Sequence, residues 1–350
     1  MTTKSGKNAQ IREAMLYEAG EKGRLVCNLC EHRCKLREGK AGICGVRENR
    51  GGKLYTLVYG LVIAGHVDPI EKKPLFHFAP GSLSMSVGTP GCNFRCVHCQ
   101  NWSISQSTKR RRPTPSDDVI SPEQLVAMAK HHNCRTIAYT YTEPTIFFEY
   151  AYDTAKLAVS QDIRNVFVTN GYMTPEALDA IYPDLHAANV DLKAFDDKTY
   201  RRKMGARLQP VLDSIRKMKE QGIWLEVTTL VIPTINDSDE ELKDIAEFIK
   251  SVGPEIPWHI SRFHPDHTLL DLLPTPVSTL GRAREIGLEA GLRYVYTGNI
   301  PGDSGEHTLC YSCGAMLIKR FGFQVLENRI ESGACPDCGA SIDGFELSKR

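Results

Sequence analysis

Eleven of the twelve cysteines in this 350-residue chain fall into three tightly spaced groups. The middle group, Cys92, Cys96 and Cys99, offers three thiolates, whereas a structural zinc site needs four ligands. Thiolates are the usual ligands of iron–sulfur clusters, and a cubane held by three cysteines keeps one iron open. His98 is the nearest further ligand, but it sits inside the same loop and could not easily turn toward the metal. The spacing therefore favours a reactive metal centre over a structural zinc site or a disulfide.

The remaining composition excludes some classes of protein. A formal net charge of +1 gives no global attraction to nucleic acid or to an anionic membrane. The most hydrophobic stretch, residues 55–65, is too short to span a bilayer. We therefore expect a cytoplasmic protein without a membrane segment. In that reducing compartment grouped cysteines are read as metal ligands and the ungrouped Cys134 as a buried core residue.

The middle of the chain alternates short apolar runs with helical segments, which predicts a parallel sheet. Helix starts are marked by Ser121-Pro122, by Thr174-Pro175 and by residues 237–240. Seven strands are too few for a closed eight-unit barrel, so we predict an α/β fold with a partial (β/α)6-type barrel. The predicted strands are residues 83–87, 136–139, 165–168, 188–192, 224–231, 258–260 and 293–296.

Three regions follow from these patterns. Residues 1–80 are predicted to form an N-terminal cysteine-rich cap, and residues 81–300 the barrel. Residues 301–350, from Pro301 onward, are predicted to form a C-terminal module in which glycine and cysteine recur.

Polar residues recur where the predicted strands end, and parallel α/β barrels carry their functional groups at this end. The second strand ends in Tyr141-Thr142-Glu143-Pro144, where a carboxylate beside main-chain groups could hold an ammonium ion. Further candidates at strand ends are Asn170, Gly171, Asp191 and Lys193. His259, Arg262, His264 and Asp266 are candidates for the substrate side of the barrel.

The spacing C-x3-C-x2-C resembles the signature of the radical S-adenosylmethionine (SAM) superfamily. The resemblance implies a [4Fe-4S] cluster on Cys92, Cys96 and Cys99, whose open iron binds the amino and carboxylate groups of SAM. Thr142 and Glu143 are similar to the end of a Gly-Gly-Glu-Pro element that binds the methionine amino group, with Tyr141-Thr142 in place of the two glycines. His98 stands where relatives commonly carry an aromatic residue near the adenine.

Asn170, Asp191 and Lys193 match positions that approach the ribose and carboxylate of SAM in the pyruvate formate-lyase activating enzymes. Gly171 would let the backbone come close. The resemblance implies that a one-electron donor such as flavodoxin or ferredoxin reduces the cluster. SAM is then cleaved to a 5′-deoxyadenosyl radical, which abstracts hydrogen from a substrate.

The two flanking cysteine groups suggest further metal sites. Cys310, Cys313, Cys335 and Cys338 form two CxxC-Gly knuckles, which resemble a zinc ribbon or a rubredoxin-like site for zinc or iron. Cys27, Cys30, Cys34 and Cys44 fit zinc or a second iron–sulfur cluster, and their spacing does not choose between the two.

The order of all these features resembles the AmmeMemoRadiSam-system radical SAM enzymes over nearly the whole chain. The resemblance rests on the four-cysteine head, residues 68–78 (DPIEKKPLFHF), Cys99-Gln100-Asn101-Trp102, Tyr296-Thr297-Gly298-Asn299 and the tail knuckles. Those proteins are similar to glycyl-radical-enzyme activases. The resemblance implies a link with Memo-like and AMMECR-like proteins, and it leaves two kinds of substrate open, a glycyl residue of a partner protein or a modification substrate.

An alternative is a non-enzymatic metal or iron–sulfur scaffold that binds protein or RNA through its zinc ribbon and a basic loop. The basic loop is the run Lys109-Arg110-Arg111-Arg112, followed by Pro113-Thr114-Pro115. Such a run is more often a solvated face. A scaffold would also give no shared reason for polar residues at so many strand ends.

Overall fold

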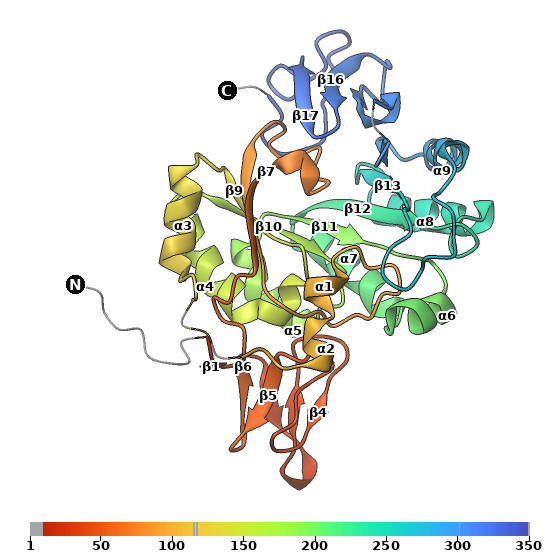
Figure 1. Ribbon diagram of the computed structural model, residues 1–350. Helices are drawn as coiled ribbons and strands as arrows, with labels where there is room; N and C mark the ends of the chain where they lie inside the picture. Colours follow the sequence, from red (N-terminus) through yellow and green to blue (C-terminus); the bar gives the residue numbers. More distant parts are fainter. Residues whose placement is uncertain (1–9, 115, 117, 301, 349–350) are drawn as a thin grey trace.

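The computed structural model describes residues 10–114, 116, 118–300 and 302–348. Its centre is an eight-stranded sheet in the order β14-β13-β12-β11-β10-β9-β8-β7 (Figure 1). Strands β8 to β14 run parallel, and β7 pairs antiparallel with β8. The strands are β7 (Ala64–Pro69), β8 (Leu83–Gly88), β9 (Thr136–Tyr139), β10 (Arg164–Thr169), β11 (Ala187–Asp191), β12 (Trp224–Val231), β13 (Trp258–Arg262) and β14 (Val295–Gly298).

Because β14 and β7 stand at opposite edges of the sheet, the barrel is open, and the predicted α/β fold is confirmed. Each of the seven predicted strands overlaps a parallel strand, although the last begins at Val295 rather than at residue 293. Sequence patterning missed β7, because its small and polar residues Ala64, Gly65 and His66 lack the β-branched or aromatic character of a typical strand.

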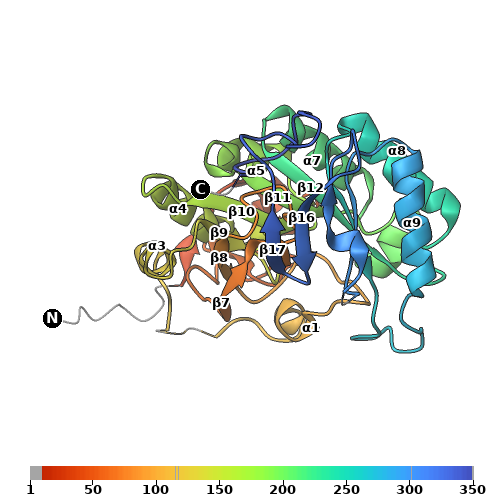
Figure 2. The same ribbon diagram turned by 90° about the horizontal axis from the view of Figure 1, so that it is seen from above.

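Six helices lie along the outer side of the sheet, as the view from above shows (Figure 2). They are α3 (Pro122–His131), α4 (Phe148–Val159), α5 (Pro175–Ile181), α7 (Gln209–Glu220), α8 (Asp239–Val252) and α9 (Val277–Glu289). The predicted starts are correct: Ser121 caps α3 in a capping box with Gln124, and Thr174 and Ser238 cap α5 and α8. Three shorter helices, α1 (Trp102–Ser105), α2 (Ser107–Arg110) and α6 (Asp197–Thr199), lie in connections.

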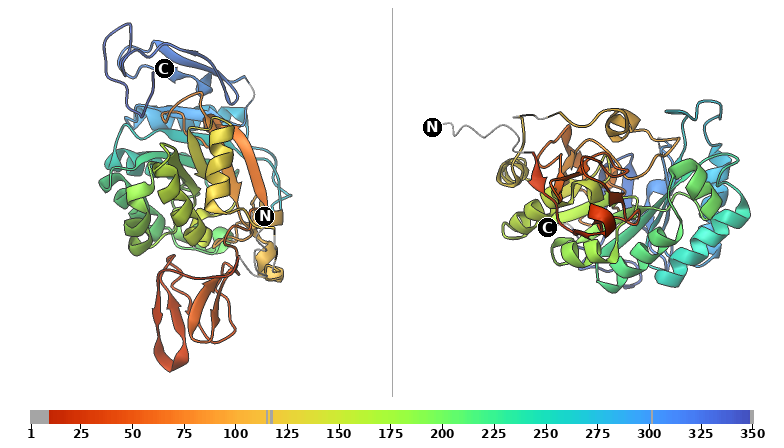
Figure 3. Two further views of the ribbon diagram at one scale, coloured as in Figure 1. Left: turned by 90° about the vertical axis from the view of Figure 1, so that its left-hand side faces the viewer. Right: turned by 90° about the horizontal axis from the view of Figure 1, so that it is seen from below.

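Two small three-stranded sheets carry the N-terminal cysteines. One contains β1 (Arg12–Glu13), β6 (Lys53–Thr56) and β5 (Arg47–Arg50), and the other contains β2 (Tyr17–Ala19), β3 (Leu25–Cys27) and β4 (Lys35–Leu36). Buried residues of this N-terminal module, such as Leu29 and Val46, belong to the same hydrophobic core as the barrel. The module lies at the end of the barrel where α1 and α2 are found (Figure 3).

The C-terminal module lies at the opposite end of the barrel (Figure 1). Its sheet contains β15 (Thr308–Leu309), β16 (Met316–Phe321) and β17 (Gln324–Asn328). Its small core is shared with Phe76, Tyr294 and Tyr296, which lie outside the module. The buried carboxylate of Glu226 accepts hydrogen bonds from the backbone N–H groups of Phe76, at 2.9 Å, and His77, at 2.8 Å. The chain after β7 is thereby held across the barrel end that the module covers.

The predicted division at residues 80 and 300 stays a prediction. The central sheet includes β7, which lies within the predicted cap, and Pro301 lies outside the described residues. Pro115 of the basic segment also lies outside them. In the part of the chain that the structure describes, no helix has both the length and the apolar character needed to cross a membrane.

Candidate active site

The predicted residues at the strand ends meet in one place. A cavity of about 530 Å³ opens among the carboxyl ends of the parallel strands. All predicted residues of the cluster and SAM site line it except Gly171; they are Cys92, Cys96, Cys99, His98, Thr142, Glu143, Asn170, Asp191 and Lys193. Parallel strands place their ends at one edge, which explains why residues 100 positions apart converge.

The loop that carries the three cysteines is held by backbone hydrogen bonds on both sides. Arg95 N donates to Met204 O at 2.7 Å, and Val97 N donates to Lys203 O at 3.0 Å. Phe94 is buried, with its ring against Tyr172. These contacts fix the loop without using the sulfur atoms, so the thiols remain available to the cavity.

Two of these thiols have strongly perturbed acidities. Burial raises the pKa of Cys96 to about 12, and burial together with the nearby carboxylate of Glu143 raises the pKa of Cys92. Thiolates are the metal-binding form, so these thiols must release protons when a metal binds. Burial and the charges of Lys193 and Lys203 lower the pKa of His98 to about 3, so its ring is neutral at pH 7.

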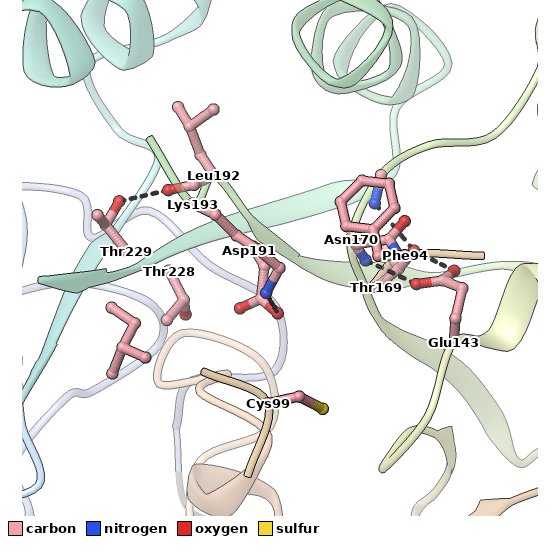
Figure 4. Close-up of polar contacts among 12 residues, drawn as sticks. Phe94, Cys99, Glu143, Thr169, Asn170, Asp191, Leu192, Lys193, Thr228 and Thr229 are labelled. Atoms are coloured by element: carbon pink, nitrogen blue, oxygen red, sulfur yellow. Dashed lines mark hydrogen bonds and ion pairs between the residues drawn. The ribbon is translucent and has the colours of Figure 1, made fainter. Parts of the chain in front are cut away.

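Glu143 connects the ends of two neighbouring strands. Its Oε1 accepts hydrogen bonds from Thr145 Oγ1 at 2.6 Å and Thr169 Oγ1 at 2.7 Å, and its Oε2 accepts one from Asn170 N at 2.8 Å (Figure 4). Burial raises the pKa of this carboxyl group, and the bond from Asn170 N opposes the increase. Because Oε2 accepts one bond and lines the cavity, it keeps acceptor capacity for a cationic group there.

Asn170 connects the strand end with the cysteine loop. Its Nδ2 donates to Asn93 Oδ1 at 2.8 Å, beside Cys92. Gly171 follows with φ +68°, and a Cβ there would come within 2.8 Å of Val190 Cγ1. Glycine is therefore required for packing against β11, and this residue contributes to the turn instead of the cavity wall.

Asp191 and Lys193 form an ion pair of 2.8 Å in the cavity wall (Figure 4). Burial disfavours the charged ammonium group, but Asp191 and Cys96 nearby raise the net pKa of Lys193 above its ordinary value. Lys193 is thus a fixed cation next to a cluster cysteine. Thr142 is held at the opposite wall, where its Oγ1 donates to Thr89 O at 2.8 Å.

The donor set fits an iron–sulfur cluster better than a single zinc ion. Among the described residues, the one group of metal-ligating side chains close enough to hold a single ion is Cys310, Cys313, Cys335 and Cys338, whose sulfur atoms all lie within 4.8 Å of one another. Cys92, Cys96 and Cys99 line the cavity without forming such a group, and a multi-iron cluster needs more widely spread ligands. Buried His98 Nδ1, Asn93 Nδ2 and Thr89 Oγ1 also lack hydrogen-bond partners in the described chain.

The four N-terminal cysteines surround a second enclosed space. Cys27, Cys30, Cys34 and Cys44 line it, and they do not form a single-ion group in the described structure. Burial raises the pKa of Cys34 to about 11 and also raises the pKa of Cys30 and Cys44. Their assignment to zinc or to a second cluster stays a prediction.

This N-terminal module contacts the cysteine loop of the cavity directly. Lys109 Nζ donates to Ile43 O at 2.6 Å and to Cys92 O at 2.5 Å, so one ammonium group joins the two cysteine-bearing segments. The ring of His32 is bonded through Nε2 to Asn93 O at 2.9 Å. A Cβ on Gly91, where φ is +108°, would lie 3.1 Å from Cys44 O, so the close approach needs glycine.

The predicted basic loop is therefore wrong in part. Lys109 and Arg110 belong to helix α2, because Arg111 N donates back to Ser107 O at 3.2 Å. Arg112 pairs with Glu48 at 2.8 Å. Sequence spacing could not show this, because the partners lie about 60 residues earlier and are largely backbone carbonyl groups.

Of the two interpretations that the sequence leaves open for His259, a substrate-side residue or the more common hydrogen-bonded structural histidine, the structure agrees with the second. His259 is the second residue of β13 and lies toward the opposite barrel end, where its Nε2 contacts Glu226 Oε2 at 2.6 Å. Arg262, His264 and Asp266 do not line the cavity either. Ser261 lines it instead, because it points to the face of β13 opposite to its neighbour Arg262 and lies closer to the carboxyl end of the strand than His259.

Sequence reasoning missed a set of residues at the floor of the cavity. Lys72 and Lys73 line it, and Tyr141 stands beside them. Asp68 binds both lysines. Asp68 and the two lysines belong to the motif of residues 68–78, which supported the family resemblance. The motif alone did not indicate that its lysines lie inside the barrel.

The profile of the radical SAM superfamily matches residues 86–249, which contain the three cavity cysteines, Glu143, Asn170, Asp191 and Lys193. Residues 86–249 therefore form a radical SAM domain. An uncharacterized protein of Methanocaldococcus jannaschii is 44% identical over 340 residues, covering 95% of this chain and 99% of the relative.

Another relative of this radical SAM enzyme is the pyruvate formate-lyase-activating enzyme of Clostridium pasteurianum. It is 21% identical over 196 residues, covering 55% of this chain and 79% of the relative. A solved domain of the corresponding enzyme from Bacteroides vulgatus aligns with a TM-score of 0.41 and 21% identity, over 46% of this chain and 98% of that domain.

Proposed function

We propose that this radical SAM enzyme cleaves SAM reductively at a [4Fe-4S] cluster held by Cys92, Cys96 and Cys99, and that it abstracts hydrogen from a substrate in the same cavity. When bound, the cluster supplies one electron to the sulfonium of SAM, which releases a 5′-deoxyadenosyl radical. The observation that carries the proposal is the convergence of three cysteines and the strand-end polar groups on one cavity wall.

The chain's own residues hold and orient SAM. Glu143 Oε2 accepts the amino group of the methionine part, and the hydrogen bonds from Thr169 and Asn170 keep the carboxylate in position. Lys193, paired with Asp191, attracts the SAM carboxylate or the ribose hydroxyls. His98 and Thr142 also line the cavity, and in this proposal the neutral ring of His98 contacts the adenine and Thr142 the methionine part.

The proposal extends to the substrate, the electron donor and the partner proteins. A Methanocaldococcus jannaschii relative named as a putative glycyl-radical enzyme activating enzyme supports a glycyl residue of a partner protein as one target. A flavodoxin or ferredoxin is the proposed electron donor, and Memo-like and AMMECR-like proteins are proposed partners on the basis of the sequence resemblance. The protein works in the cytoplasm in this proposal. The C-terminal four-cysteine site holds zinc or iron in a structural role.

The scaffold alternative has less support. Two of the four basic residues proposed for RNA or protein binding, Lys109 and Arg112, bind the N-terminal module. An RNA-binding surface needs its cations free for phosphate groups.

The test is anaerobic reconstitution with iron and sulfide, reduction, and measurement of 5′-deoxyadenosine formed from SAM. Wild type and Cys134→Ala should both form it, since Cys134 is buried outside the cavity. Cys99→Ala should form none. Full turnover in Cys99→Ala would overturn the proposal, and so would a reduced wild-type protein that carries its cluster and never cleaves SAM.

A further inference from the structure

The floor of the cavity contains two cations and one anion that no part of the SAM site uses. Asp68 Oδ1 accepts from Lys72 Nζ at 2.9 Å, and its Oδ2 accepts from Lys73 Nζ at 2.7 Å. Both lysines line the cavity that the cysteines share. Two ammonium groups against one carboxylate leave a local excess of positive charge.

The two lysines differ in their access to solvent. Lys73 is buried at 2% exposure, whereas the side chain of Lys72 is 45% exposed. Burial lowers the pKa of Lys73, and Asp68 opposes this by stabilising its charged form. An ammonium group has three N–H donors, and the one hydrogen bond that the ammonium group of Lys73 makes in the described structure goes to Asp68. A buried cation with unused donors favours an anionic partner.

Neighbouring strands add unpartnered hydroxyl groups on the same face of the sheet. Asp68 is paired with Ser84 across β7 and β8, and Ser84 is paired with Thr136 across β8 and β9, so all three side chains point to one face. Ser84 Oγ and Thr136 Oγ1 are fully buried and have no hydrogen-bond partner in the part of the chain that is described. Asp68 places this face inside the barrel, because its partners line the cavity.

Tyr141 joins this floor to the SAM site. It directly precedes Thr142 and Glu143, and its hydroxyl group donates to Asp68 Oδ2 at 2.6 Å. The ammonium group of Lys73 lies 4.8 Å from the centre of its ring. A ligand held at Lys73 is thus adjacent to the strand end that holds SAM.

We propose that Lys72 and Lys73 form an anion subsite at the cavity floor, which binds a carboxylate or phosphate group of a small-molecule substrate. The subsite rests on the proposed function, because that function makes this cavity the substrate site. The anionic group anchors the substrate below SAM, so that its reacting C–H bond faces the 5′ carbon. A neutral peptide glycine gives the two lysines nothing to pair with, so the floor favours an anionic small molecule.

The experiment measures binding of inorganic phosphate, propionate and uncharged propionamide to the full-length, cluster-reconstituted protein with SAM present, by isothermal titration calorimetry. We expect one saturable site per chain for phosphate or for propionate, and the better probe identifies the chemical class. Propionamide should not bind. The dissociation constant should rise at least ~10-fold in Lys72→Gln and in Lys73→Gln, because each removes a charge-assisted hydrogen bond.

Lys53→Gln is the matched control, since Lys53 is an exposed lysine that pairs with Glu13 on the N-terminal module. Lys72→Gln keeps the test valid if Lys73→Gln fails to fold, because the Lys72 side chain is substantially exposed. Absence of saturable binding, equal binding of propionamide, or binding unchanged in Lys72→Gln would each overturn the subsite.

Formation of 5′-deoxyadenosine by the wild-type samples separates the two proposals. If the wild-type protein cleaves SAM but binds neither anion, the proposed function stands and the subsite is overturned. If it binds an anion through Lys72 but never cleaves SAM, the subsite stands and the proposed function is overturned.

Discussion

The cavity and the C-terminal module place cysteine side chains in contrasting environments. In the C-terminal module four sulfur atoms converge within 4.8 Å, and Cys313 and Cys338 are exposed. In the cavity three cysteines face ionisable and polar groups from successive strands, and Cys96 is buried. Burial raises the pKa of Cys96 to about 12. The number of cysteines and their surroundings distinguish a closed, structural metal site from a reactive metal centre.

The largest expected effect comes from removing one cysteine in each of the two regions and comparing the two variants. Cys96→Ala should lower the rate of 5′-deoxyadenosine formation at least ~100-fold, about 2.7 kcal/mol in activation free energy. Cys338→Ala should keep the rate within about threefold and lower the melting temperature, because it opens a four-thiolate site. The two readouts are product quantification and thermal unfolding. Equal loss of turnover in both variants would remove the distinction.

The stability that the contact between the C-terminal module and the barrel contributes should depend on pH. Burial lowers the pKa of His77 to about 4, and its ring bonds Asp343 O at 2.7 Å and the hydroxyl group of Tyr296. The unfolded histidine binds a proton below about 6.5, so stability is complete above that pH and falls as the pH drops toward 4. The loss amounts to roughly 3 kcal/mol.

Denaturant unfolding between pH 4 and pH 7 measures this slope. His77→Phe should reduce the slope, whatever its effect on the stability at pH 7, whereas the exposed His131→Phe on α3 should leave it unchanged. A slope that is identical in wild type and His77→Phe would assign the pH dependence to other groups.

A smaller effect is expected at the SAM-binding wall. Glu143→Gln should weaken SAM binding about 10-fold, because the neutral amide loses a charge-assisted hydrogen bond to the amino group. Equilibrium dialysis with SAM measures it. Glu176→Gln, at an exposed residue paired with Arg33, is the control and should leave affinity unchanged. Unaltered SAM affinity in Glu143→Gln would limit Glu143 to a role in connecting the strand ends.

The last prediction concerns the contact between the N-terminal module and the cavity loop. Lys109→Met removes hydrogen bonds to Ile43 O and Cys92 O and should lower the free energy of unfolding by about 1–3 kcal/mol. Arg110→Met, at the exposed neighbour, should change it by less than about 0.5 kcal/mol. Chemical denaturation measures both, and equal stability of the two variants would contradict the joining role of Lys109.

Much of the fold was predictable because its signals are local. Apolar runs mark the parallel strands, and Ser121, Thr174 and Ser238 mark helix starts through bonds within one turn. The candidate site followed from a topological rule, since residues at the carboxyl ends of parallel strands share one edge.

The failures involve contacts over long sequence separations. His259 shares a face of β13 with Ser261, which lines the cavity, but it lies two residues nearer the opposite barrel end, where it contacts Glu226. Lys109 lies in a basic run typical of a solvated surface, and its acceptors are backbone atoms of a distant module. Lys72 and Lys73 depend on β7, whose residues have little strand character. The residues of a short segment do not reveal partners that lie far away in the sequence.

The backbone bonds of Phe76 and His77 also set an order of events during synthesis. Their acceptor, Glu226, lies 150 and 149 residues later, and the acceptor for the His77 ring, Asp343 O, lies 266 residues later. The base of the barrel is therefore among the last parts to assemble as the chain leaves the ribosome. Until those residues have been synthesised, Phe76 and His77 lack the acceptors that hold them across this end of the barrel.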